Sequence, residues 1–302
     1  MTVNTWIVVA GDPAIGTLIA TARSLGGEVT AAVVGTRQVA DTVAAGGVDK
    51  VVWFGEPDDA PVEAYAGAVA DAIAAAPAVV LGGMGPSERV LLGAAAAKLR
   101  APVLTGGTGV TVDGEELTVK RTVYGGIAED TVTVSGPVVL VLDGGPVPAG
   151  TGTVSPIEEV AATALPMTVV ITKPSEFEHA DLGAAARVVG IGRGLKTKDD
   201  LVLINSLAGA ADAEIACSRP LAEGLDWLGR DRYIGCSGWN LSPEVYFAIG
   251  ISGQLQHMVG VRGAKTIVAI NSDPNAPVFA EADYGLVGDL YQLVPAVIEA
   301  LK

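Results

Sequence analysis

The sequence predicts an α/β protein of two domains, each a doubly wound, mainly parallel sheet, the first with an added antiparallel β portion. Over most of the 302 residues, apolar strand-like runs alternate with segments of helical apolar period, a rhythm typical of parallel sheets covered by helices on both faces. Between 110 and 134, apolar and polar residues alternate across short Gly and Asp turns, which is typical of antiparallel strands with one wet face. Half the residues are apolar and only 5% are aromatic, which suits closely packed layers of small side chains.

The first domain is expected over 1–180. Its first strands are expected at 6–10, 29–34, 50–54 and 78–81, with helices at 14–26, 37–46, 61–73 and 87–99. Antiparallel strands are expected at 110–119, 121–126 and 130–134, and 138–142 is expected to return to the core. Residues 144–153 are rich in Gly and Pro and are expected to form a loop. A further strand is expected at 163–171, and the charged segment 173–181 is expected to be the linker.

The second domain is expected over 187–302. Its strands are expected at 187–190, 214–217, 232–235, 244–251, 265–270 and 283–287. The helices between and after them are expected at 198–211, 220–228, 253–260, 276–281 and 289–301. This order of strands and helices predicts a second parallel sheet.

The chain is acidic, with 19 basic and 34 acidic residues and a formal net charge of −15. Neutralising nucleic-acid phosphates needs clustered Lys and Arg, and the sequence shows no such cluster, so a nucleic-acid partner is not expected. An acidic surface chiefly serves solubility, and it can also steer the protein toward a basic docking face.

Neither a membrane span nor a secreted setting is expected. The most apolar windows, around 64–83 and 137–142, are interrupted or too short to cross a bilayer. The first residues lack the basic start and small-residue cleavage site of a secretory signal. Two cysteines, Cys217 and Cys236, make neither a disulfide framework nor a four-ligand zinc site. A reduced, cytoplasmic setting is the expectation.

Small, polar or charged residues follow five apolar strand-like runs in the last third of the chain. They are the glycine turn 190–194, Ser218 with Arg219, the segment 236–238, the segment 252–254 and the segment 271–273. In an open parallel sheet all such strand ends open onto one crevice, which is where these sheets bind nucleotides. The sequence therefore predicts a ligand cleft in the second domain.

Two turns in this region can face a phosphate. Gly-Ile-Gly-Arg-Gly at 190–194 lacks the full Gly-x-Gly-x-x-Gly spacing, so a packing turn and a phosphate-facing turn are equal alternatives. Ser252 and Gly253 stand where a strand ends and a helix begins, and free amides there would stabilise a pyrophosphate or a flavin carbonyl. Gln256 and His257 lie one turn further on, and His257 is expected to reach back over this helix start.

Further polar side chains at the strand ends suit a flavin. Arg219 stands at the mouth of the crevice, where the alternative is a surface ion pair, and a guanidinium against a flavin ring favours added negative charge. Ser237 can donate to a ring nitrogen, and Asn271 and Asp289 can bind ribose and adenine. For Cys236, contact with a flavin and simple packing both remain open.

The sequence contains no Gly-x-Ser-x-Gly elbow before a helix and no His/Cys/Asp cluster with metal-ligand spacing, which argues against a hydrolase and a metal site. Three classes remain: an electron carrier without substrate turnover of its own, a nicotinamide-dependent oxidoreductase on the same kind of sheet, and a scaffold that has lost its cofactor. Only His257 stands out as an acid/base for hydride transfer, which weighs against the second.

Several motifs together resemble the FAD-binding half of electron transfer flavoprotein alpha subunits. They are Ser-Arg-Pro-Leu at 218–221, Gly-Cys-Ser-Gly at 235–238, Ser-Pro-Glu-Val-Tyr at 242–246, Gly-Ile-Ser-Gly-Gln-Leu-Gln-His at 250–257, Val-Ala-Ile-Asn at 268–271, Asp-Pro-Asn-Ala-Pro at 273–277 and Ala-Asp-Tyr-Gly-Leu-Val-Gly-Asp at 282–289. The segments 217–223 and 256–260 are most similar to the branch named for nitrogen fixation and carnitine reduction. Residues 87–98 and 121–126 resemble the family's first domain more loosely.

The resemblance implies an electron-carrier subunit, not an enzyme, that pairs with a smaller beta subunit and shuttles electrons from dehydrogenases, acting on acyl-CoA or similar substrates, to a quinone reductase or other acceptor. It implies FAD on a Rossmann-like sheet in the second domain, with AMP or a second FAD in the partner, and it gives the first domain the partner contact. By resemblance, Arg219 lies over the flavin ring, Ser237 binds its reactive nitrogen, His257 its pyrimidine carbonyl, and Asn271 and Asp289 the adenosine end.

The residues expected to bind the cofactor all lie on or beside the strand ends. They are Gly192, Arg193, Gly194, Ser218, Arg219, Cys236, Ser237, Gly250, Ser252, Gly253, Gln254, Gln256, His257, Asn271, Asp273, Asp289 and Leu290. Two departures from the family pattern flank the ring: Cys236-Ser237 stands where Gln-Thr is usual, and Trp239 where a basic or small residue is usual. Both are expected to affect the redox potential and the choice of donor.

Overall fold

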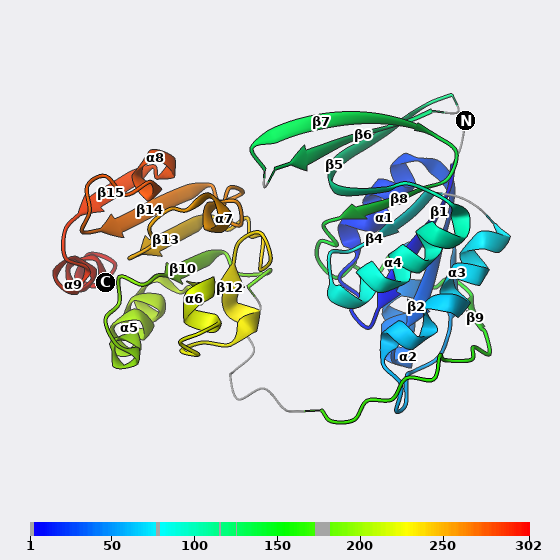
Figure 1. Cartoon of the computed structure of the whole chain (residues 1–302), viewed down its shortest axis with the longest axis horizontal. Coiled ribbons are helices and arrows are strands. Elements are labelled where there is room, and N and C mark those ends of the chain that lie inside the picture. The colour runs from blue at the N-terminus through cyan, green and yellow to red at the C-terminus, as the bar shows by residue number, and fades with distance from the viewer. Residues whose placement is uncertain (1–2, 77–78, 115, 125, 173–181) are drawn as a thin grey trace. The chain divides into compact units, whose positions relative to one another are not determined.

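The computed structural model of this chain describes residues 3–76, 79–114, 116–124, 126–172 and 182–302. The chain divides into two compact units, Met1–Thr172 and Lys173–Lys302, each with its own sheet (Figure 1). The predicted α/β fold with two mainly parallel sheets is confirmed. The predicted linker at 173–181 and position 78 of a predicted strand lie outside the described residues.

The first unit is built on a parallel sheet of alternating strands and helices. Its parallel strands are β1 (Val3–Ala10), β2 (Gly26–Val34), β3 (Lys50–Trp53), β4 (Val79–Gly82), β8 (Val138–Leu142) and β9 (Ile157–Glu159). Its helices are α1 (Gly16–Ser24), α2 (Arg37–Ala45), the 3-10 turn η1 (Val62–Tyr65), α3 (Ala66–Ala75) and α4 (Pro86–Leu99). The whole sheet has the order β7-β6-β5-β8-β4-β1-β2-β3-β9. The strands buried on both faces are rich in Val, Ile, Ala and Leu, as parallel strands between two helix layers require.

The antiparallel portion is confirmed and forms a curved ribbon at the end of this sheet (Figure 1). It consists of β5 (Val103–Asp113), β6 (Glu116–Val123) and β7 (Ala128–Ser135). The single strand expected at 110–119 is wrong, because the chain turns at Gly114, with a φ of +63°, between β5 and β6. The start of β5 pairs in parallel with β8, and after a register shift at Gly107 the strand continues as the antiparallel partner of β6. Side chains of β7 alternate between half-buried and exposed, in agreement with the polar and apolar alternation of its sequence.

The strand expected at 163–171 is wrong. The ladder of β3 is instead extended by β9 at Ile157–Glu159, and 163–171 has no regular secondary structure. Pro166 interrupts the apolar run and lacks the backbone N–H that a ladder needs. Leu165 and Val169 still donate backbone N–H groups, to the carbonyls of Ala64 and Asp59, so the segment is held by isolated hydrogen bonds.

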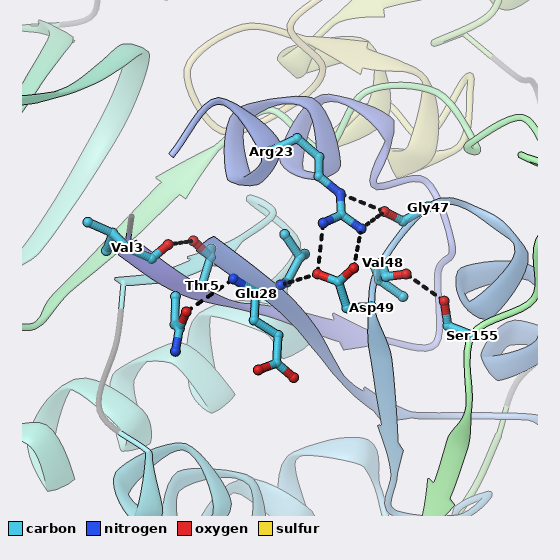
Figure 2. Close-up of polar contacts among 10 residues, drawn as sticks. Val3, Thr5, Arg23, Glu28, Gly47, Val48, Asp49 and Ser155 are labelled. Carbon is cyan, nitrogen blue, oxygen red and sulfur yellow. Dashed lines mark hydrogen bonds and ion pairs between the residues drawn. The ribbon is translucent and has the colours of Figure 1, made fainter. Parts of the chain in front are cut away.

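An ion pair between Arg23 and Asp49 connects the end of α1 to the residue before β3 in the first unit (Figure 2). Arg23, at the end of α1, donates to both carboxylate oxygens of Asp49 at 2.7 and 2.9 Å and to the Gly47 carbonyl. Asp49 also accepts the backbone N–H of Val29, and the Arg23 guanidinium holds the pKa of this carboxyl below its usual range. Near this ion pair, Ser155 donates a hydrogen bond to the Val48 carbonyl (Figure 2). Arg23, Asp49 and Ser155 line an open cavity of about 490 Å³.

The second unit is a parallel sheet of six strands in the order β12-β11-β10-β13-β14-β15. The strands are β10 (Arg187–Ile191), β11 (Glu214–Ser218), β12 (Tyr233–Ile234), β13 (Val245–Ile249), β14 (Thr266–Asn271) and β15 (Tyr284–Val287). Numbered along the unit this is the order 3-2-1-4-5-6: all strands are parallel, and the order in which successive strands are added reverses between β10 and β13. Parallel sheets of this order bind ligands outside the carboxyl ends of the strands at the reversal point.

Helices cover both faces of this second sheet. They are η2 (Lys198–Asp200), α5 (Leu201–Ala211), α6 (Arg219–Ala222), η3 (Arg230–Arg232), α7 (Leu255–Met258), α8 (Val278–Glu281) and α9 (Leu290–Ala300). The helices expected at 220–228, 253–260 and 276–281 are each reduced to about one turn. Gly224 ends α6 at a φ of +115°, and Gly253, at a φ of +83°, delays the start of α7. Within the described ranges, no helix is long and apolar enough to cross a membrane.

Candidate functional site

The carboxyl ends of five neighbouring strands in the second unit surround a cavity of about 600 Å³. The loops after β10, β11, β12 and β13 line it, together with the last residue of β14. The predicted site residues on its wall are Gly192, Arg193, Gly194, Ser218, Arg219, Cys236, Ser237, Gly250, Ser252, Gln254, Gln256, His257 and Asn271. The expectation that separate strand ends meet around one cleft is therefore met by the geometry.

Backbone packs directly against backbone where the β10 and β13 loops meet. Gly192 donates its N–H to the Ile249 carbonyl at 3.0 Å, and Gly194 donates to the Gly250 carbonyl at 3.2 Å. A Cβ on Gly192 would lie 2.3 Å from the Gly250 carbonyl oxygen, and one on Gly194 would lie 2.6 Å from the Gly250 Cα. Because no side chain fits here, bare backbone forms the cavity wall at the reversal point.

Arg219 stands at the cavity wall, directly after β11, and is paired with an acidic neighbour. Its Nε donates to Glu223 at 2.6 Å, and Arg230 approaches the same carboxylate at 3.8 Å. The Arg219 side chain is 63% exposed. The guanidinium therefore forms the surface ion pair that was one alternative from the sequence, and it also lines the cavity, while its contact with a flavin stays a prediction.

The loop after β12 supplies two predicted residues. Cys236 is an exposed free thiol on the cavity wall, and its N–H donates to the Gln256 carbonyl at 2.9 Å. Tyr233, also on the wall, donates its hydroxyl to the Ser237 carbonyl. The other cysteine, Cys217, is buried under the sheet, and burial raises the pKa of its thiol to about 12, so this sulfur remains a packing group.

The loop after β13 leads from Gly250 into α7. Ser252 and Gln254 lie on the wall, followed by Gln256 and His257 in the helix. The helix start at this place spans only Leu255–Met258, so the helix dipole expected here contributes little. The loop therefore contributes side chains and the backbone N–H groups of its turn to the cavity wall.

His257 is the deepest polar side chain of the wall, with 8% of its surface exposed. Its Nε2 is hydrogen-bonded to the hydroxyl of Tyr246, in β13, at 2.7 Å. Its Nδ1 is buried and has no hydrogen-bond partner in the part of the chain that the structure describes. Burial lowers the pKa of His257 to about 4, and a weaker contact with the Ile234 carbonyl acts in the opposite direction. The imidazole is therefore neutral at pH 7.

Four predicted site residues lie off the wall. A Cβ on Gly253 would lie 2.0 Å from the first backbone nitrogen of α8, so this glycine permits a close approach of backbone. Asp289 caps α9 by accepting a backbone N–H at 3.0 Å, and Asp273 accepts a backbone N–H in its own turn. Leu290 is buried in the core under α9. Asn271 is on the wall, but its Nδ2 donates to the Ile251 carbonyl and its Oδ1 accepts the Asp273 N–H.

The sequence reasoning missed several wall residues and the partner of the histidine. Pro220, Tyr233, Ile234, Gly235 and Ile251 also line the cavity. Tyr246 belongs to an expected strand and to the motif at 242–246 but was given no role, yet a tyrosine in a buried strand must find a partner for its hydroxyl. That requirement is the signal by which it could have been found. Among the described residues, no group of three His, Cys, Asp or Glu could hold a metal ion.

Comparison with known proteins gives matches along both units. Residues 12–165 match the electron transfer flavoprotein domain, and residues 181–262 match the electron transfer flavoprotein FAD-binding domain. Protein FixB of Escherichia coli O17:K52:H18 is 38% identical over 289 residues, covering 93% of this chain and 92% of that protein. Protein FixB of Escherichia coli O139:H28 is 40% identical over 261 residues, with 83% of each chain covered. Protein FixB of Shigella flexneri is 37% identical over 289 residues, covering 93% of this chain and 92% of that protein.

Proposed function

Because this chain belongs to the electron transfer flavoprotein family, as an alpha-type subunit, we propose that the cavity at its second sheet holds FAD. One observation carries the proposal: five strand ends meet around one cavity at the point where the strand order of the sheet reverses. The alternative from the sequence, a nicotinamide-dependent oxidoreductase, is not favoured by the family matches.

The residues present fit a dinucleotide. The wall formed by Gly192, Gly194 and Gly250 has no side chains, so a bound group can approach the backbone closely, as a pyrophosphate does. Among the described residues, the buried Nδ1 of His257 has no hydrogen-bond partner, and an unpaired buried donor or acceptor costs about 1–3 kcal/mol. A ligand that supplies the missing partner removes that cost.

Bound FAD supplies one- and two-electron redox chemistry, and the side chains of the wall set the field around it. Arg219 places a positive charge at the cavity, which favours a reduced, negatively charged ring, and Glu223 opposes that charge in part. We assign to Ser237, on the cavity wall, a hydrogen bond to the ring, and to the neutral His257 a hydrogen bond to a ring carbonyl. Asn271, Asp289 and Asp273 lie toward β14 and α9, where we place the adenosine end.

The subunit carries electrons and has no substrate turnover of its own. Family membership implies a heterodimer with a beta subunit, and we assign the partner contact to the first domain, 1–180, and the FAD site to the second, 187–302. Dehydrogenases are the proposed donors and a quinone reductase or other acceptor the proposed receiver. We also propose that the partner subunit binds AMP or a second FAD. The proposed setting is the cytoplasm.

The test is co-purification of the native complex followed by cofactor extraction. We expect the beta subunit to accompany this chain and about one FAD per alpha subunit, seen as oxidised-flavin absorption, to be released on denaturation. The complex is the right sample because the chain alone can lose FAD. A colourless complex that binds NADH would contradict the proposal and support an oxidoreductase.

A further inference from the structure

Tyr246 is a fully buried polar residue behind the cavity. Its exposed fraction is 0%, and its hydroxyl contacts Nε2 of His257 at 2.7 Å. Burial raises the pKa of this hydroxyl, so it keeps its proton at neutral pH. A buried hydroxyl without a partner is costly, which makes the histidine contact the one that stabilises Tyr246 in the core.

A glycine in the neighbouring strand makes room for this ring. Tyr246 pairs with Val188 of β10, and its ring extends along the sheet over Gly190, two residues closer to the cavity. A Cβ on Gly190 would lie 1.9 Å from the Tyr246 hydroxyl and 2.4 Å from its Cζ. The first glycine of the turn at 190–194 therefore serves the placement of Tyr246, while the later glycines form the wall.

The contact has a preferred proton direction. If His257 donated from Nε2, the Tyr246 hydroxyl proton would be buried without an acceptor, because no other partner of that hydroxyl is present in the described residues. If Tyr246 donates, its proton is satisfied and Nε2 is the acceptor. A neutral imidazole that accepts at Nε2 carries its proton at Nδ1.

We propose that Tyr246 is a positioning residue that fixes His257 in the Nδ1-protonated tautomer, so that the wall offers a neutral N–H donor to a carbonyl of the bound cofactor. The tautomer is inferred from the contact between Tyr246 and His257 alone. The hydrogen bond from Nδ1 to a cofactor carbonyl rests on the proposed function. The unpartnered, buried Nδ1 is the atom that this donor role requires.

The tautomer is tested directly by nitrogen-15 NMR of the full chain labelled at histidine. The chain has only two histidines, so a His179→Gln variant assigns both. We expect Nδ1 of His257 to appear as the protonated nitrogen and Nε2 as the unprotonated one at pH 7. Protonation at Nε2, or at both nitrogens, overturns the proposal.

The role of Tyr246 is tested with Tyr246→Phe, which keeps the ring and removes the hydroxyl. We expect His257 to lose its single tautomer and to show a mixture or the Nε2-protonated form. Tyr284→Phe is the matched control, since that hydroxyl is on an exposed residue of the same unit, away from the cavity wall, and we expect no change. An unchanged His257 tautomer in Tyr246→Phe contradicts the positioning role even if stability falls.

A third measurement separates this inference from the proposed function. In the heterodimer reconstituted with FAD, we expect Tyr246→Phe to weaken FAD binding about fivefold, the effect of one ordinary hydrogen bond. If Tyr246→Phe alters the tautomer of His257 but binds FAD as tightly as the wild-type heterodimer, the proposed hydrogen bond from Nδ1 to the cofactor is contradicted. Absence of FAD binding in the wild-type heterodimer contradicts the proposed function and leaves the tautomer result standing.

Discussion

His257 connects the pocket to the core, and its burial has a consequence for stability. Its pKa is about 4 in the folded chain, against 6.5 for an ordinary histidine. As pH falls below 6.5 the unfolded chain takes up a proton that the folded chain does not, so stability falls with pH until about 4. Stability is therefore highest, for this group, above pH 6.5.

The first prediction is a loss of about 2 kcal/mol of unfolding free energy between pH 7 and pH 5 that His257→Gln lacks. Denaturant unfolding of both proteins at the two pH values measures it. Carboxylates with lowered pKa values, such as Asp49, are common to both proteins, so their contribution cancels in the difference. Equal pH dependence in the two proteins contradicts a buried neutral His257.

Arg219 and Glu223 give a second prediction at this scale. Glu223→Gln removes the negative charge opposite the guanidinium, so the one-electron potential of FAD in the heterodimer should rise by tens of millivolts. Potentiometric titration measures the shift. Glu299→Gln makes the same charge change at an exposed site on α9, paired with Lys302 and off the cavity wall, and should shift the potential much less. Equal shifts would assign the effect to net charge.

At the scale of single elements, β10 shows how a local sequence choice follows from packing. Gly190 is a glycine inside a buried strand, where glycine has poor intrinsic preference. The ring of Tyr246 occupies the space that a side chain would need. The glycine in β10 is therefore explained only once β10 and β13 are known to be neighbours.

The third prediction compares two Gly→Ala changes in the second unit. Gly190→Ala forces a Cβ into the Tyr246 ring and should destabilise the chain by about 1–3 kcal/mol or more. Gly209→Ala, in α5, meets nothing within 4 Å and should stabilise it by about 0.5–1 kcal/mol, because alanine favours a helix. Urea unfolding midpoints of both variants measure the signs. The same sign for both would contradict this packing.

The sequence predicted the elements better than their ends. The period of the apolar residues was sufficient for β8, α5 and the presence of the antiparallel ribbon, but not for the turn at Gly114 that divides the strand expected at 110–119. It failed at 163–171, where one proline outweighs strand-forming neighbours, and at α6, α7 and α8, which glycine turns or Pro277 shorten. The cavity wall could be predicted from the strand ends, because the carboxyl ends of parallel strands lie at one edge of the sheet. The role of Tyr246 could not be predicted, because it depends on β10 and β13 being adjacent, which the apolar period does not reveal.

At the scale of the whole molecule, each unit has a core of its own on both faces of its sheet. In the first unit α1 and α2 cover one apolar cluster, and α3 and α4 cover the other. In the second, α5 and α9 cover one cluster, and the residues around Tyr246 and Met258 form the other. Among the described residues, each of these four clusters is made up of residues of one unit. Each unit therefore has the apolar burial that independent folding needs.

The fourth prediction is that residues 182–302 fold when expressed alone. Circular dichroism should show an α/β spectrum, and unfolding in urea should be a single cooperative transition. The matched fragment 1–172 should behave in the same way. A fragment 182–302 that lacks a cooperative transition would show that the second unit depends on the first or on the partner subunit.

Hydrogen exchange of the heterodimer with and without FAD tests the central claim most directly, because it reports every strand end in one measurement. Protection on FAD binding should appear together at 192–194, 218–219, 235–237 and 250–257, and the cavity beside Arg23 and Asp49 should exchange unchanged. If FAD binds while these four loops keep their exchange rates, or protects residues of the first unit instead, the cofactor lies elsewhere.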